Sequence, residues 1–225
     1  MSVLNKVVSD WYRDYYNQIC VTARDSIFSR YVHRTMERKN KSNKGLKILE
    51  VGGHSGEHLI YVENSYSSYL LTDLQKISAK LKKEMEIGGV KFAIADAQNL
   101  NLKSATFDRV ISTCLFHHLS DPYKAAIELR RVTKVGGTIT ILIPTDPGFC
   151  YRGLQYLTSG IRAKRANIYS QMNLVHAIEH RNHFLGLKNL LEKAFQGCEL
   201  KLSYYPFRIP SYNANAFTIL TVKKR

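Results

Sequence analysis

Residues 47–58 read KILEVGGHSGEH, and this stretch decides the fold that the sequence predicts. Its first five residues are mostly apolar, include the acidic Glu50 and have the composition of a short β-strand. The chain then breaks at Gly52 into a glycine-rich turn, and the apolar residues 59–62 can start a helix. Glycine permits positive φ and close approach of a ligand. A turn of this kind at the carboxyl end of a strand therefore predicts a ligand site in an open α/β sheet.

Strands and helices alternate on the carboxyl side of this turn. The sequence predicts further strands at residues 68–72, 90–95, 107–113 and 138–143, with helices at 59–65, 76–87 and 121–133. Such alternation favours a doubly wound, mostly parallel α/β sheet with right-handed crossovers. Two final runs, 199–205 and 216–222, predict an antiparallel C-terminal hairpin that brings the sheet to seven strands.

The remaining segments predict helices around this sheet. Apolar residues at helical spacing, from Leu4 to Ile19 and again near Tyr31, indicate N-terminal helices that lie against the sheet or over its ligand. A polar run at 38–45 is typical of a linker. We expect an N-terminal helical cap at 1–45 and one domain at 46–225, with a helical insert at 146–197 before the last strands.

Composition limits the compartment and the partners. The four cysteines lie far apart without C-x-x-C spacing, and the longest apolar run is strand-sized, so we expect free thiols in a cytoplasmic protein. The net charge of +15 is concentrated in residues 1–47. A basic surface attracts polyanions, so a nucleic acid, an anionic membrane or a phosphate-bearing substrate would fit, as would a solvated helix face. A monomer and a homodimer are both compatible with the sequence.

Three acidic residues follow or end successive predicted strands. Glu50, Asp73 and Asp96 should line one crevice, because the carboxyl ends of parallel strands share one edge of the sheet. Asp73 follows the glycine turn by close to the ~20 residues expected for an acid that binds ribose hydroxyls. The turn lacks the G-x-G-x-x-G order of a dinucleotide site, and Glu50 would repel phosphates. These features favour an adenosine cofactor with a cationic end.

Residues 46–145 resemble the class I S-adenosylmethionine-dependent methyltransferases of the type 11 kind, which have a Rossmann-like fold. Their first motif corresponds to Glu50–Gly56 of this chain. Later motifs of that family follow in the right order, and they are Ala95-Asp96-Ala97, Phe107–Ile111, Leu115–Leu119 and Gly136-Gly137-Thr138. His54 departs from the family pattern because it stands where a glycine is usual.

The resemblance implies a role for each cofactor residue, with S-adenosylhomocysteine as the product. Gly52, Gly53 and Gly56 would wrap the methionyl part, and Glu50 would orient its ammonium group directly or through water. His54 lies within this loop. The other implied contacts are Asp73 to the ribose hydroxyls, Leu74 and Asp96 and the Ala97 N–H to the adenine, and Cys114 and His118 near the methyl group.

The acceptor side must supply alignment and, for a hydroxyl acceptor, a base. If residues 171–185 form one helix, His176, His180 and His183 share a face, and we favour His180 as the base with His118 and His176 as alternatives. Tyr151 and Arg152 could grip the acceptor, and Arg162, Lys164 and Arg165 could hold a phosphate. His176–His180 also matches the H-x-x-E-H pattern of one zinc peptidase class, but we expect no metal ion.

The acceptor itself stays open between classes. Residues 146–190 also resemble the insert of methyltransferases encoded with enzymes of bacterial surface polysaccharides, which implies O-methylation of a nucleotide- or lipid-linked sugar. A quinone or other aromatic acceptor would suit the 14 Tyr and 9 Phe equally well. An RNA-binding or RNA-modifying protein on the same fold is the alternative of a different class. The place of the Asn-Pro-Pro-aromatic motif found in many RNA methyltransferases reads Cys114–His118, which favours a small molecule or glycan.

Overall fold

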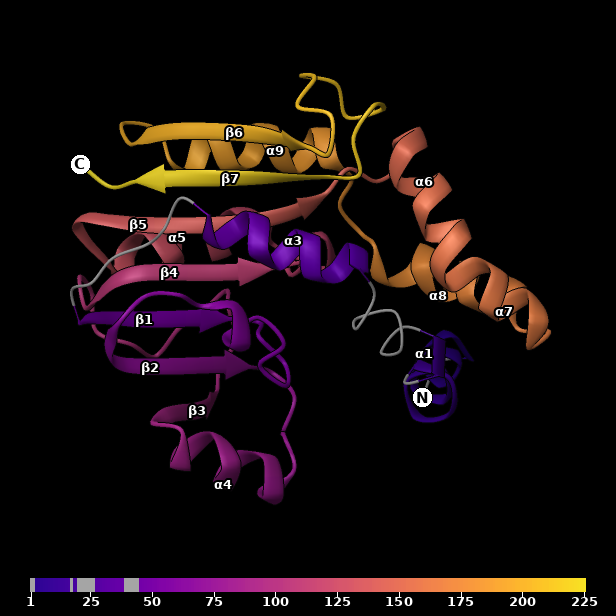
Figure 1. The fold of residues 1–225 in the computed structure, drawn as a ribbon, viewed down its shortest axis with the longest axis horizontal. Coiled ribbons are helices and arrows are strands. Elements are labelled where there is room, and N and C mark those ends of the chain that lie inside the picture. Colours follow the sequence, from indigo (N-terminus) through magenta and orange to yellow (C-terminus); the bar gives the residue numbers. More distant parts are fainter. Residues whose placement is uncertain (1–2, 17, 20–26, 39–44) are drawn as a thin grey trace.

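The computed structural model describes residues 3–16, 18–19, 27–38 and 45–225 (Figure 1). Most of the predicted linker at 38–45, and part of the predicted N-terminal helices, lie outside these ranges. Among the described cysteines, Cys150 and Cys198 are free thiols. Among the described helices, none combines the length and the apolar character that crossing a membrane requires.

The predicted seven-stranded Rossmann-like α/β sheet is confirmed. Its strand order is β3-β2-β1-β4-β5-β7-β6, with β1 to β5 parallel and β7 antiparallel to both of its neighbours. The strands are β1 (Leu46–Val51), β2 (Tyr66–Asp73), β3 (Val90–Ile94), β4 (Phe107–Thr113), β5 (Thr133–Pro144), β6 (Glu199–Tyr205) and β7 (Phe217–Lys223).

Strand β5 begins five residues before the predicted strand at 138–143. Thr133 already pairs with Phe107, and the register shifts before Arg109 pairs with Thr138. The predicted Gly136-Gly137 turn is therefore an irregularity inside the strand. Gly136 accommodates it with a φ of +74°, and its N–H donates to the carbonyl of Lys224.

Helices cover both faces of the sheet and extend beyond its carboxyl edge (Figure 1). Buried side chains of α5 and α9 pack on one face, and those of α3 and α4 pack on the other. The α-helices are α1 (Val3–Asp14), α3 (Ile27–Glu37), α4 (Ala79–Ile87), α5 (Pro122–Val132), α6 (Phe149–Gln155), α7 (Ile161–Arg165), α8 (Tyr169–Glu179) and α9 (Phe184–Ala194). Shorter helical turns are η2 (Leu59–Tyr61), η3 (Phe116–His118) and the π-helical η4 (Tyr156–Gly160).

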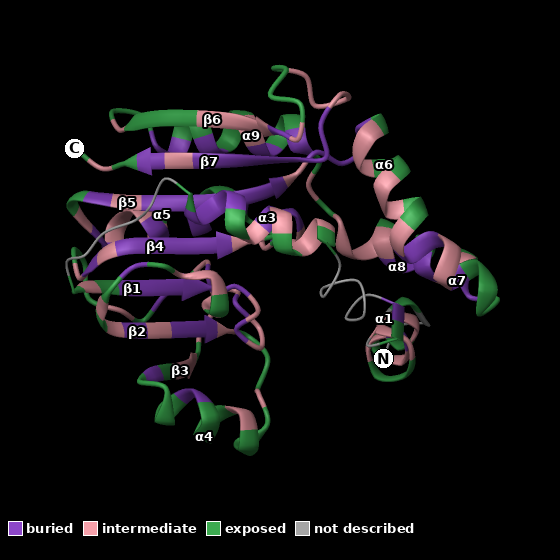
Figure 2. Cartoon of the chain, in the orientation of Figure 1, coloured by how far each residue is buried: buried purple, intermediate pink, exposed green. Residues whose placement is uncertain are grey.

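The burial pattern separates this core from a second, smaller one. Strands β1, β4 and β5 are largely buried along their length (Figure 2). Away from the sheet, Trp11 and Ile19 pack with Met172 and Val175 of α8 in a cluster of their own. Helices α1, α6, α7 and α8 therefore stand beyond the carboxyl ends of the parallel strands, where the ligand site was predicted. Helix α9, although inside the predicted insert 146–197, belongs to the layer on the sheet.

Two predicted helices are wrong. The predicted helix at 59–65 is only the single turn η2, because Val62 is extended and Asn64 turns inward, where its side chain accepts a hydrogen bond from Arg109. The predicted helix at 171–185 ends at Glu179. The chain leaves the helix axis after Glu179 because the side-chain amide of Asn182 donates to the carbonyls of Phe116 and Leu119.

Candidate active site

A cavity of about 610 Å³ lies at the carboxyl ends of β1, β2 and β4. This volume is within the range of about 300–1,000 Å³ that small-molecule and cofactor sites occupy. Predicted cofactor residues on its wall are Gly52, His54, Asp73, Leu74, Ala97, Cys114 and His118. The predicted ligand edge of the sheet is therefore hollow.

The glycine turn owes its shape to close packing beneath it. Gly52 has a φ of +71°, and a Cβ there would lie 2.8 Å from a methyl carbon of Leu115. A Cβ on Gly53 would lie 2.8 Å from the carboxyl carbon of Glu50. Gly53 and Gly56 are not on the cavity wall, so in the described structure their role is packing.

His54 fills the glycine position of the family pattern with a left-handed backbone. Its φ is +43°, a conformation that costs a non-glycine residue roughly 1–3 kcal/mol. Its backbone N–H donates to Asp73 Oδ2 at 2.9 Å, and its ring Nδ1 lies 2.8 Å from Ser55 Oγ. These contacts hold the turn against the end of β2 and offset the backbone strain.

Asp73 and Leu74 together present a polar and an apolar surface to the cavity. The Asp73 carboxylate accepts from the N–H groups of His54 and Gln75, both at 2.9 Å, and each oxygen retains a second lone pair. Leu74 is 62% exposed although it lies on the wall of a cavity. An acceptor of hydroxyl groups beside an uncovered apolar side chain suits a ribose joined to a flat base.

Asp96 is less directly placed than predicted. Its neighbours Ala95 and Ala97 line the cavity, but Asp96 itself does not. Its carboxylate accepts from the backbone N–H of Gln98 at 2.8 Å and from the Gln98 side chain at 3.1 Å. The adenine contact predicted for Asp96 stays a prediction.

Glu50 lies behind the turn. It is fully buried, and its Oε2 accepts from the Tyr69 hydroxyl at 2.6 Å. Its Oε1 is also buried and has no hydrogen-bond partner among the described residues. Burial raises the pKa of Glu50, against the opposing charge of His58 and the Tyr69 hydrogen bond. The orphaned oxygen fits a nearby cationic group, but Glu50 does not reach the cavity wall, so its predicted ammonium contact stays a prediction.

A second cavity, of about 370 Å³, adjoins the first. Cys114 and His118 line both, so the two cavities meet where β4 ends. The second is mostly apolar and aromatic, although two predicted base residues, His176 and His180, also line it. Its aromatic lining consists of Trp11, Tyr12, Tyr16, Phe28 and Tyr151. A molecule held there would face the end of the first cavity nearest Cys114.

His180 is oriented by an acid that the sequence analysis missed. Its Nδ1 lies 3.3 Å from Asp146 Oδ2, while Asp146 Oδ1 pairs with Arg152 Nε at 2.9 Å. Burial acts to raise the pKa of Asp146, but the His180 hydrogen bond and the Arg152 charge outweigh it and lower this pKa. Donation from Nδ1–H leaves His180 Nε2 as the basic nitrogen. Asp146 follows β5 as Asp73 ends β2, a signal that could have found it.

The other predicted histidines occupy different surroundings. His118 Nδ1 donates to the Glu179 carbonyl at 3.0 Å, and burial together with the His180 charge lowers the pKa of His118 to about 4. Gln155 donates to His176 Nδ1, and burial lowers the pKa of His176 to about 4 as well. His183 caps α9 and is not on either cavity wall. The predicted common helix face is wrong, yet the His176 and His180 rings stack at 4.8 Å.

The predicted phosphate-binding residues lie elsewhere. Arg162, Lys164 and Arg165 belong to α7 and are not on the wall of either cavity. Lys164 Nζ donates to the Tyr156 hydroxyl at 3.0 Å and lies over the Tyr156 and Tyr169 rings. Tyr151 lines the second cavity, whereas Arg152 pairs with Asp146, and the predicted contact of both residues with an acceptor stays a prediction.

Comparisons with known proteins agree with this geometry. Residues 49–141 match the family described as "Methyltransferase domain". The whole chain also has the fold of an S-adenosylmethionine-dependent methyltransferase from Thermotoga maritima, at a TM-score of 0.62 and 16% identity over 99% of this chain and 100% of that one. A Mesorhizobium loti enzyme of the same description gives a TM-score of 0.55 at 16% identity, over 89% and 99% of the two chains.

The curated relatives align with part of this chain over part of their own length. A 2-methyl-6-phytyl-1,4-hydroquinone methyltransferase from Oryza sativa subsp. japonica is 30% identical over 47% of this chain and 33% of its own length. The ubiquinone/menaquinone biosynthesis C-methyltransferase UbiE from Marinomonas sp. is 26% identical over 55% of this chain and 54% of its own length. The chain therefore spans about half or less of these relatives.

The seven-stranded sheet and its flanking helices therefore have the Rossmann-like fold of methyltransferases, with a cavity at the carboxyl edge of the sheet. Residues 49–141 of this chain match a methyltransferase domain, and S-adenosylmethionine dependence is part of the description of the two solved structures.

Proposed function

We propose that this chain transfers a methyl group from S-adenosylmethionine to an aromatic small molecule that carries a hydroxyl group. The observation that carries the proposal is the meeting of the two cavities at Cys114 and His118, with His180 on the wall of the second. An in-line methyl transfer needs donor and acceptor to meet end to end in this way.

The first cavity has the chemistry to hold the methyl donor. Asp73 would accept from the ribose hydroxyls and Leu74 would pack on the adenine, while the Gly52 turn leaves room for the methionyl part. When bound, the cofactor supplies an electrophilic methyl group on a sulfonium. Cys114 and Leu115 would then form the wall beside the transferred group.

The second cavity favours an aromatic acceptor over a sugar. Its aromatic walls suit stacking and edge contacts with a ring. Two hydroxyl groups that could have served a sugar are already engaged, since Thr158 and Ser159 donate to the carbonyls of Leu154 and Gln155. The printed names of the curated relatives, which act on hydroquinones or in quinone biosynthesis, also support an aromatic acceptor.

His180 would accept the proton that the acceptor hydroxyl gives up. His180 lines the second cavity, and its Nδ1 donates to Asp146. This hydrogen bond holds the ring in one tautomer, with the lone pair on Nε2. The Asp146 carboxylate would stabilise the imidazolium that forms, and Arg152 keeps that carboxylate ionised. Removal of the proton makes the acceptor a better nucleophile at oxygen or at a ring carbon.

An acceptor panel tests the proposal. Chain incubated with S-adenosylmethionine should methylate a simple quinol or catechol, and the product should be detected by mass spectrometry. Asp73→Ala should raise the cofactor dissociation constant by about tenfold or more, because it removes hydrogen bonds to the ribose and frees the turn. If the chain methylates nucleotide- or lipid-linked sugars but not quinols, the acceptor is a glycan and not an aromatic molecule. Undetectable cofactor binding by calorimetry would refute it altogether.

A further inference from the structure

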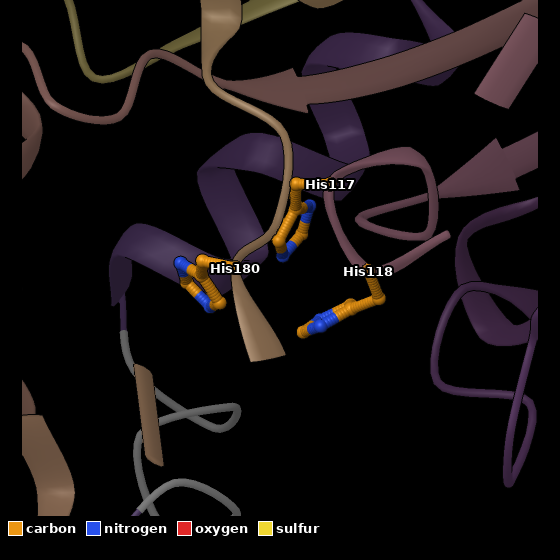
Figure 3. Close-up of side chains that lie close together, drawn as sticks. All are labelled: His117, His118 and His180. Atoms are coloured by element: carbon orange, nitrogen blue, oxygen red, sulfur yellow. The ribbon is translucent and has the colours of Figure 1, made fainter. Parts of the chain in front are cut away.

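Three histidines meet at the wall between the two cavities. His117 and His118 come from η3 after β4, and His180 comes from the segment after α8 (Figure 3). One ring nitrogen from each lies within 4.8 Å of the others. The ring centroids are 4.0 Å apart for His117 and His118, 4.5 Å for His117 and His180, and 5.2 Å for His118 and His180. Two segments that are distant in sequence thus bring three imidazoles to one point.

Outer contacts leave the inner nitrogens of two rings available. His118 donates from Nδ1 to the Glu179 carbonyl, and His180 donates from Nδ1 to the Asp146 carboxylate. Each ring is thereby fixed with its Nε2 lone pair free of that bond. Histidines that ligate metals almost always donate their other ring N–H to a carboxylate or a backbone carbonyl in this manner.

The third ring has an unsatisfied polar atom. His117 is 6% exposed, and its Nδ1 is buried with no hydrogen-bond partner among the described residues. Burial, followed by the charges of His118 and His180, lowers the pKa of His117 well below its usual value. A buried ring nitrogen without a partner among the described residues is a position that a metal ion could satisfy.

We propose that His117, His118 and His180 bind one divalent transition-metal ion, with Zn²⁺ the best match, and leave a fourth position open to the second cavity. Three imidazole nitrogens plus one open position is a ligand set that Zn²⁺ accepts. Zn–N bonds of about 2.0–2.1 Å place tetrahedral ligand nitrogens roughly 3.4 Å apart, so small rotations of the rings close the site.

This site differs from the one that the H-x-x-E-H pattern would predict. That pattern uses His176 and His180, but their rings stack nearly parallel, at 13°, and His176 Nδ1 accepts from Gln155. His176 is thus a neighbour of the cluster and not a member. It provides a matched control, because it lines the same cavity and is a partly buried histidine whose pKa is also lowered.

A bound ion would alter the chemistry of the acceptor cavity. The ion and the acceptor proton need the same lone pair, Nε2 of His180. Metal binding and proton removal by His180 are therefore mutually exclusive. Zn²⁺ should inhibit turnover by the base mechanism, and a chelator should restore it.

Metal binding is measured on the full chain alone, without cofactor or acceptor, so the result does not depend on the proposed activity. Chelator-treated protein is equilibrated with Zn²⁺ or Co²⁺, dialysed, and analysed by mass spectrometry for metal content. We expect about one ion per chain, and Co²⁺ should give the intense visible absorption of a tetrahedral site. His118→Gln and His180→Gln should each weaken binding at least tenfold, while His176→Gln should leave it unchanged.

Two outcomes would overturn the proposal. One is wild-type protein that retains no more Zn²⁺ or Co²⁺ than the His118→Gln/His180→Gln double variant. The other is a His176→Gln variant that loses metal as completely as the cluster variants. Circular dichroism of each variant checks that it is folded, and a rise of the melting temperature with Zn²⁺ in the wild type but not in the double variant gives a second readout.

Discussion

At the scale of single residues, the acceptor site depends on one acid behind one histidine. Asp146 is 8% exposed and holds both the ring of His180 and the guanidinium of Arg152. The Asp146 carboxylate therefore has two effects: its oxygen accepts from Nδ1–H and so fixes the tautomer of His180, and its charge can stabilise an imidazolium. Asp146→Asn keeps the shape of the side chain and removes its charge, so it separates the effect of the hydrogen bond from the effect of the charge.

We predict that His180→Gln lowers kcat by about 10²–10⁴-fold, the usual contribution of a general base, and leaves cofactor affinity unchanged. Asp146→Asn should lower kcat by a smaller factor, since Asn still accepts from Nδ1–H but cannot stabilise an imidazolium. Steady-state kinetics and cofactor calorimetry on the same preparations provide the test. Equal activity of His180→Gln and wild type would remove His180 from the reaction.

At the scale of elements, a buried ionic network fastens α3 to the sheet. Arg109 of β4 donates to both carboxylate oxygens of Glu37, and His58 Nε2 donates to Glu37 Oε1 at 2.9 Å. His33, one turn earlier on α3, lies 2.8 Å from His58 through its Nδ1 and also lines the first cavity. Docking of α3 is thus tied to the shape of the cofactor site.

This network predicts acid sensitivity. Burial would raise the pKa of Glu37, but hydrogen bonds from Arg109 and His58 overcome it and lower this pKa from 4.5 to about 2. A carboxyl group whose pKa is lowered on folding stabilises the folded state at pH values above its unfolded pKa. For Glu37 that stability is lost as the pH falls from 4.5 towards 2. The loss should be roughly 3 kcal/mol in the free energy of unfolding.

Urea titrations between pH 7 and pH 2.5 check this against Glu37→Gln. The variant should be less stable at neutral pH, because Arg109 is left buried without a counter-charge. Its stability should also vary less with pH below 4.5. Parallel curves for the two proteins would assign the acid sensitivity to other carboxylates.

The sequence predicted the strands well because their patterns are local. Strands β4 and β6 match their predicted bounds of 107–113 and 199–205, and Asp73 and Leu74 lie on the wall of the first cavity, while their predicted cofactor contacts stay predictions. The helices at 59–65 and 171–185 failed because Asn64 and Asn182 bind groups distant in sequence. The His180–Asp146 pair and the position of His117 likewise depend on tertiary contacts, which no local pattern encodes.

At the scale of the whole molecule, exposed apolar side chains and positive charge occur together beside the acceptor cavity. Phe149 of α6 is 80% exposed, and Phe207 and Ile209, in the loop between β6 and β7, are 64% and 53% exposed. The two segments are neighbours, since the N–H of Cys150 donates to the carbonyl of Asn213 at 3.0 Å (Figure 1). Arg152 and Arg208 lie in the same two segments. Together with the net charge of +15, these residues favour contact with an anionic membrane surface.

We expect the chain to sediment with vesicles that contain anionic lipid and to be released as salt rises, because charge attraction is screened. Phe149→Ser with Phe207→Ser should weaken this binding several-fold. Ile87→Ser, which removes an apolar side chain that is 79% exposed on α4, is the matched control. Equal binding to neutral and anionic vesicles would contradict the expectation.

The packing of Trp11 indicates which part of the chain sets the acceptor specificity. Trp11 is 2% exposed, clusters with Met172 and Val175 of α8, and also lines the second cavity. Most of the wall of the second cavity thus comes from helices outside the sheet, whereas the turns after β1 and β2 line the first cavity. Exchange of α6 and η4, which line the second cavity and not the first, should therefore alter which compound is modified and leave binding of the methyl donor unchanged. We therefore expect acceptor specificity to follow the exchanged helices when they are moved to another protein of this fold.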